Sequence, residues 1–177
     1  MTSLLAFNNT GTAASFKVQA ELFQISSHTL LIEFKLLGPL AQVVWPSPGV
    51  IETREDGLWK TTCLEAFLSS GDQKNDPYFE INCSPNGNWN AYSFGSYRDG
   101  MTPSPNITVR LKERSTEANE AHFQIEIQNS SPWEIKSYGL TAVIEFSNGE
   151  KSYWALRHPG SAADFHDKAG WNPLATH

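Results

Sequence analysis

An alternation of apolar and polar residues recurs along most of this chain and limits its fold more than any other feature. The clearest case is Phe123 to Ile127, where apolar residues alternate with His122, Gln124 and Glu126. Comparable runs lie at 16–22, 30–36, 61–68, 78–83, 89–94, 107–112, 140–146 and 151–156. A period of two places successive side chains on opposite faces of a strand, and no window favours a long amphipathic helix.

Turn residues separate these runs. Asn86-Gly87 and Asn148-Gly149 each stand between two alternating runs, as in tight β-hairpins. The chain has 177 residues, enough for one domain with a sizeable core. The pattern therefore predicts an all-β, single-domain antiparallel β-sandwich over residues 1–177, immunoglobulin-like or jelly-roll-like, with about ten strands.

Charge and composition narrow the partners and the compartment. The formal net charge of −6 argues against nucleic acid and anionic membranes as partners. The N-terminal residues lack a secretory pattern, no run approaches a membrane span, and we expect a cytoplasmic protein. If Glu65 and Glu80 face the same way on neighbouring strands, alternation places Cys63 and Cys83 on opposite faces of the sheet, which predicts two free thiols.

Aromatic and polar residues between Trp59 and Tyr92 form the best candidate site. Trp59 opens the predicted strand that carries Glu65, and Glu80 and Asn82 share a face of the next. An indole packs against the C–H face of a sugar ring, while carboxylates and amides bind its hydroxyls. The same pattern is compatible with Trp59 and Tyr92 in the core and Glu80 and Asn82 on a solvated face.

Trp154 is a second aromatic candidate, near the end of the chain. It shares a face with Ser152 and Leu156, whereas Tyr153 and Arg157 lie on the other. Trp154 is equally compatible with a place in the core. We include Trp154 for stacking and Arg157 for hydrogen bonding in the predicted ligand site.

Other chemistry finds less support in the sequence. His158, Asp164 and His166 have donor atoms for a metal, but their spacing matches no helical or hairpin ligand pair. Glu65 and Glu80 have the residue types of a glycosidase pair, but on a shallow surface. Because no catalytic motif is present, the prediction is a binding protein rather than an enzyme.

Two spaced segments resemble the DOMON-like superfamily, and more closely its domains similar to the family 9 carbohydrate-binding module. The first reads Leu58-Trp59-x5-Glu65-Ala-Phe-Leu, followed by Tyr78-Phe-Glu-Ile-Asn82-x-Ser-Pro-Asn-Gly-x-Trp-Asn-Ala-Tyr92. The second, Tyr153-Trp154-Ala-Leu-x-His158-Pro with Asp164-Phe-His166, is similar to uncharacterised bacterial members. The resemblance implies a β-sandwich.

The resemblance also implies residue roles. In the sugar-binding members, two tryptophans enclose a sugar at a chain end, and the first precedes a glutamate by six residues. Trp59 and Glu65 match that spacing, and Trp154 matches the second tryptophan. Those binders place an arginine and an asparagine two residues apart, where this chain has Glu80 and Asn82. Because Glu80 stands where those binders have the arginine, the resemblance does not imply that this chain shares their sugar specificity.

The resemblance implies alternatives as well. Some members hold structural calcium, and other DOMON relatives bind haem through a methionine with a histidine or lysine. Met101 and His158 would be the haem ligands here, for a role in electron transfer. A protein-interaction domain is a third possibility. The main prediction is non-catalytic binding of a carbohydrate or small polyol.

Overall fold

The structure, a computed structural model, describes residues 1–47 and 52–174 and is almost entirely β. Its strands are β1 (Thr2–Ala6), β2 (Lys17–Gln24), β3 (Thr29–Leu37), β4 (Cys63–Ser69), β5 (Tyr78–Cys83), β6 (Trp89–Phe94), β7 (Thr102–Pro103), β8 (Ile107–Thr116), β9 (Glu120–Asn129), β10 (Ser137–Glu145), β11 (Lys151–Ala155) and β12 (Asn172–Pro173). Short 3₁₀ turns lie at η1 (Gly11–Ser15), η2 (Leu40–Gln42), η3 (Leu58–Lys60) and η4 (Lys168–Gly170). The predicted all-β class is confirmed.

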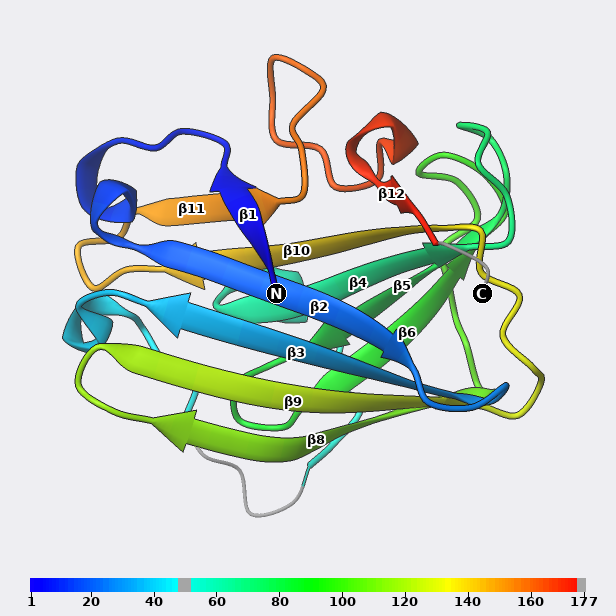
Figure 1. Cartoon of the computed structure of the whole chain (residues 1–177), viewed down its shortest axis with the longest axis horizontal. Helices are drawn as coiled ribbons and strands as arrows, with labels where there is room; N and C mark the ends of the chain where they lie inside the picture. Colours follow the sequence, from blue (N-terminus) through cyan, green and yellow to red (C-terminus); the bar gives the residue numbers. More distant parts are fainter. Residues whose placement is uncertain (48–51, 175–177) are drawn as a thin grey trace.

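The strands form one continuous antiparallel sheet that curls into two layers (Figure 1). The order is β7-β6-β5-β4-β10-β11-β1-β2-β3-β9-β8, and β12 pairs with β10. We call β2, β3, β9 and β8 the front layer, and β11, β10, β4, β5, β6 and β7 the back layer. Strand β1 joins them, because it pairs with β11 on one edge and with β2 on the other.

The main core fills the space between the layers, as the alternation predicts. In β3, every second residue from Leu30 to Leu36 is buried. In the back layer, Leu64, Ala66 and Leu68 of β4 face the same core. Burying this apolar area is the main stabilising contribution to the fold.

The outer face of the back layer is also covered. Every residue of β4 is buried, including Cys63, Glu65 and Phe67 on the side away from the main core. A second aromatic cluster lies there, formed by Phe67, Tyr78, Tyr92, Phe94 and Trp171. Glu80 and Asn82 are therefore not on a solvated face, because loops pack over it together with the segment after β11, residues 156–174, which we call the C-terminal segment.

Both predicted hairpins are present, with Gly87 at φ 94° and Gly149 at φ 86°. Glycine adopts this left-handed conformation without the penalty that a Cβ atom imposes. Strand β1 was not anticipated, because only Leu4 of its five residues is buried and its sequence does not alternate. Among the described residues, no helix has the length and apolar character to cross a bilayer.

Candidate functional site

Two neighbouring strands bring the predicted polar residues onto the outer face of the back layer. The strand register pairs Glu65 of β4 with Asn82 of β5, and Phe67 with Glu80. Glu65 and Glu80 therefore occupy diagonal positions on the same face. The opposite orientation of the two cysteines is also confirmed, since Cys63 contacts Asn82 on this face while Cys83 belongs to the main core. Both thiols are free.

Segments from three places in the chain cover this face: the turn η3, the loop after β6 and the segment after β11. Trp59, in the 3₁₀ turn η3, packs edge-on against Tyr92 with ring centroids 5.8 Å apart. Phe165 and His166, from the segment after β11, both lie against Phe67. The sequence suggested that Trp59 opens the strand that carries Glu65. That expectation is wrong, because β4 begins only at Cys63 and Trp59 lies in the turn before it.

An open cavity of about 370 Å³ lies between this cover and the sheet. Its lining combines five aromatic rings with two carboxylates and two basic groups. The lining residues are Trp59, Glu65, Phe67, Glu80, Phe94, Arg98, Met101, Val143, Tyr153, Ala163, Phe165 and His166. A mostly aromatic hollow with a few convergent polar groups is the usual form of a small-molecule site.

Glu65 lies at the floor of the cavity and is only 3% exposed. Its Oε2 accepts a hydrogen bond from the Thr141 hydroxyl at 3.4 Å. Its Oε1 is buried and has no hydrogen-bond partner among the described residues. Burial, together with the negative charge of Glu80, raises the pKa of Glu65 well above its usual value. An unpaired buried oxygen is costly to maintain, so it suggests a role beyond stability.

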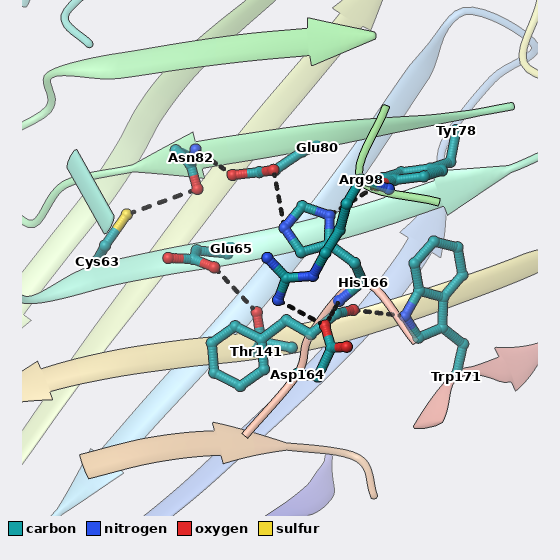
Figure 2. A network of polar contacts seen from close by, with 11 residues as sticks. Cys63, Glu65, Tyr78, Glu80, Asn82, Arg98, Thr141, Asp164, His166 and Trp171 are labelled. Carbon is teal, nitrogen blue, oxygen red and sulfur yellow. Dashed lines mark hydrogen bonds and ion pairs between the residues drawn. The ribbon is translucent and has the colours of Figure 1, made fainter. Parts of the chain in front are cut away.

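Glu80 lies beside it, with contacts shown in Figure 2. Its Oε1 accepts a hydrogen bond from Asn82 Nδ2 at 2.9 Å, and its Oε2 lies 3.8 Å from His166 Nε2. Burial raises the pKa of Glu80, although the Asn82 hydrogen bond and the charge of Arg98 act in the opposite direction. The carboxyl group is thus held by one neutral donor within a poorly solvated site.

His166 supplies no full positive charge to Glu80 at neutral pH. Burial and the charge of Arg98 lower the pKa of His166 to about 4, so its ring is neutral at pH 7. The Tyr78 hydroxyl lies 2.7 Å from His166 Nδ1 and accepts a hydrogen bond from the Arg98 backbone N–H. The Tyr78 proton is therefore free to point at Nδ1, which leaves the ring proton on Nε2, facing Glu80.

Arg98 sits at the rim and is already paired. Its guanidinium donates to Asp164 Oδ1 at 2.8 Å, and Asp164 also accepts from the Tyr97 hydroxyl. The same Oδ1 accepts from the His166 backbone N–H at 3.1 Å. Hydrogen bonds from Tyr97 and Arg98 outweigh desolvation and keep the pKa of Asp164 below its usual value. The pair links the loop after β6 to the C-terminal segment.

The predicted ligand-binding residues separate into three groups: those that line the cavity, those that support it and those that lie outside it. Trp59, Glu65 and Glu80 line the cavity. Asn82 and Tyr92 lie beneath the lining and act as supports, because both are buried. Asn82 donates to Glu80, and the Tyr92 hydroxyl donates to Asp56 Oδ1 at 2.7 Å.

Trp154 and Arg157 are not part of the cavity. Trp154 is 3% exposed, belongs to the main core and donates through Nε1 to the Ser152 hydroxyl at 2.7 Å. The slot expected between Trp59 and Trp154 is therefore wrong, because β11 turns the indole inward. Arg157 instead bonds to Asn172 Oδ1 at 2.9 Å and to the Trp171 carbonyl, which fastens the C-terminal segment.

The proposed metal and haem ligands are also dispersed. His158 Nε2 lies 2.8 Å from the Leu5 carbonyl oxygen, whereas Asp164 and His166 bind Arg98 and Tyr78. The described residues contain no group of three His, Cys, Asp or Glu side chains placed to hold a metal ion. Met101 lines the cavity and is 44% exposed, but His158 does not line it. The two do not form one axial ligand pair in this arrangement.

Seven residues of the cavity lining were not predicted from the sequence: Phe67, Phe94, Arg98, Val143, Tyr153, Ala163 and Phe165. Phe94 shares its face with Tyr92, and Tyr153 lies opposite Trp154, so alternation carried a signal for both. Arg98 and Phe165 come from loops, where no periodicity indicates the direction of a side chain. Arg98 has a left-handed backbone, with φ 55°, which only the structure reveals.

Comparison with known proteins adds information on the fold. No protein-family model matches the sequence, and no curated protein matches it. A putative carbohydrate-binding protein from Bacteroides uniformis aligns with a TM-score of 0.60 and 12% identity, over 90% of this chain and 78% of that one. A family 9 carbohydrate-binding module from Caldicellulosiruptor kristjanssonii, in complex with glucose, aligns with a TM-score of 0.50 and 8% identity, over 90% and 75%. The chain therefore has a β-sandwich fold similar to that of family 9 carbohydrate-binding modules.

Proposed function

We propose that the protein binds a carbohydrate or small polyol, without chemical turnover, in the cavity on the outer face of the back layer. One observation carries this proposal: a half-buried tryptophan, Trp59, and two buried carboxyl groups, Glu65 and Glu80, line the same open cavity. The fold shared with carbohydrate-binding modules supports it.

The cavity chemistry suits a single sugar ring. A volume of about 370 Å³ lies at the lower end of the range for small-molecule sites. The rings of Trp59, Tyr153 and Phe165 offer apolar surface to the C–H face of the sugar. Glu65 Oε1 is free to exchange a hydrogen bond with a hydroxyl group, and Glu80 provides a second polar contact. Such a site gives weak affinity, about 10 μM to 1 mM, because each exchanged hydrogen bond contributes only ~1 kcal/mol.

The test is calorimetric titration of the protein with a panel of monosaccharides that includes glucose. We expect Trp59→Ala to weaken binding of any accepted sugar at least tenfold while the protein stays folded. Trp45→Ala is a matched control, because Trp45 is also half-buried but does not line the cavity. Unchanged affinity in Trp59→Ala would contradict the assignment of the site.

A protein-interaction role is the competing proposal. It predicts that the panel gives no binding and that a partner protein competes for Trp59. The haem proposal predicts a Soret band that Met101→Ala removes. Nothing in the arrangement supports that proposal, because Met101 lines the cavity and His158 does not.

A further inference from the structure

The acids of the cavity outnumber its available positive charges. Of the described lining residues, Glu65 and Glu80 are acidic, and Arg98 and His166 are basic. Arg98 is paired with Asp164, and His166 is neutral at pH 7 because burial lowers its pKa to about 4. Neither basic group therefore compensates the two carboxyl groups fully.

The buried carboxyl group of Glu65 lacks a hydrogen-bond donor on one of its oxygens. Its side chain is buried, it lines the cavity, and its Oε1 finds no donor among the described residues. Its other oxygen accepts the long Thr141 hydrogen bond of 3.4 Å (Figure 2). A buried carboxyl oxygen without a partner carries a desolvation penalty that a bound donor would relieve.

Aromatic rings make up much of the cavity lining around the two carboxyl groups. Trp59, Phe67, Phe94, Tyr153 and Phe165 line the same hollow as the two acids. Aromatic faces attract ammonium groups, and the attraction strengthens when water is excluded. Two carboxyl groups within an aromatic enclosure match a positively charged amine better than they match a neutral hydroxyl.

We propose that the preferred ligand is a sugar with a free, protonated amino group, whose ammonium binds between Glu65 and Glu80. This inference rests on the proposed carbohydrate-binding function and specifies its ligand class. The ammonium donates to Glu65 Oε1 and to Glu80, and the sugar ring packs against Trp59. Arg98 stays with Asp164 at the rim and contacts ring hydroxyls.

Binding of such a ligand is coupled to proton release. The groups that face Glu65 are Cys63 on its own strand, Glu80 on β5, and His166 and Arg98 from the cover; Thr141 on β10 does not titrate. Because burial raises the pKa of both glutamates, the free site retains protons to a higher pH than exposed carboxyl groups do, and an ammonium that binds within that range displaces them. Affinity therefore rises with pH by up to about tenfold per pH unit for each proton released, until the amine itself deprotonates.

The experiment is calorimetric titration of the full chain with glucosamine, glucose and N-acetylglucosamine. We expect glucosamine to bind at least tenfold more tightly than either neutral sugar. We also expect its titration, repeated in two buffers of different ionisation enthalpy, to show proton release. Equal or tighter binding of glucose would overturn the amine proposal and leave the carbohydrate proposal intact.

Substitutions of single glutamates test which carboxyl groups cause the preference for glucosamine. Glu65→Gln and Glu80→Gln should each remove the preference for glucosamine, whereas Glu113→Gln, an exposed residue of β8, should retain it. A preference that persists in both cavity variants would also overturn the inference.

Cyclohexylamine, an amine without hydroxyl groups, separates the amine proposal from the carbohydrate proposal. If cyclohexylamine binds in a Glu65-dependent manner and no sugar does, the carbohydrate proposal fails. If no probe binds, both fail.

Discussion

At the scale of single residues, Glu65 is the least expected feature of the molecule. A carboxyl group with 3% exposure and an unpaired oxygen destabilises a fold, because its ionised form is poorly solvated. The fold retains it at the floor of a cavity, close to a second buried acid, Glu80. Groups held at a cost in stability often mark sites of binding.

The pH dependence of stability follows from this burial. The pKa of Glu65 is raised in the folded state, so between its usual value of 4.5 and its folded pKa the folded protein binds more protons than the unfolded chain. Unfolding free energy must then fall as pH rises through this window. We expect Glu65→Gln to stabilise the protein more at pH 8 than at pH 4.5, measured by urea denaturation.

His166 affects the pH dependence of stability in the opposite direction. Its pKa is lowered from 6.5 to about 4, so its contribution to stability is present above pH 6.5 and is lost as pH falls toward 4. The difference in unfolding free energy between Glu65→Gln and the parent protein at each pH isolates the contribution of Glu65, because both proteins contain His166. A difference that does not change with pH would contradict the burial of an ionisable Glu65.

Residue-level prediction succeeded where alternation was sufficient. It placed Glu80 and Asn82 on one face and separated Trp154 from Tyr153. It could not say which face of β11 meets the core, because both faces carry an aromatic residue. The structure turns Trp154 inward and leaves Tyr153 at the cavity.

At the scale of elements, the C-terminal segment decides whether the outer face becomes a cavity. Trp171 packs against Phe67 and donates from Nε1 to the Phe165 carbonyl at 2.8 Å. Lys168 Nζ reaches under this segment to Ser69 Oγ at 2.7 Å and to the Asp76 carbonyl at 2.9 Å. These contacts hold Phe165 and His166 over the sheet.

Gly139 of β10 makes that packing possible. A Cβ atom at this position would lie 2.8 Å from Trp171 Cδ1 and 2.9 Å from its Nε1, too close for the indole to stay in place. We expect Gly139→Ala to displace Trp171 and to increase hydrogen exchange of the backbone amides of residues 163–171. Ligand binding should weaken with it.

Gly160→Ala is the matched control for this prediction. Its added Cβ atom would meet nothing nearer than the Ala162 carbonyl oxygen at 3.7 Å, an ordinary contact. Equal exchange rates in the two variants would show that Trp171 does not hold the cover. No sequence pattern predicted this element, because it consists of loops with only the short strand β12.

At the scale of the whole molecule, β1 connects the two layers. It pairs with β11 and β2, and its single buried residue, Leu4, is 4% exposed and belongs to the main core. We expect Leu4→Ala to reduce the unfolding free energy by about 2–5 kcal/mol, the usual effect of truncating a buried leucine.

Leu5 supplies the comparison on the same strand, since it is 54% exposed. Leu5→Ala should change the unfolding free energy by about 0.5 kcal/mol or less. Urea denaturation measures both variants, and similar values for the two would contradict the role of β1 as a buried connection.

Sequence patterning predicted the strands well but not their assembly. Alternation found nine of the longer strands because each buries one face against a core. It gave no information on the long-range pairings of β4 with β10 and of β1 with β11, which bring distant segments together. The cavity depends on those pairings and on loops, so only part of its lining could be anticipated.

The most direct test of the account uses the indole N–H signals of the six tryptophans in a two-dimensional NMR spectrum. Titration with glucosamine or another accepted sugar should shift the Trp59 signal saturably, because Trp59 lines the cavity. The signal of Trp154, buried in the main core, should remain in place. A saturable shift of Trp154 with an unmoved Trp59, or no shift of Trp59 with any sugar that binds, would contradict the assignment of the cavity.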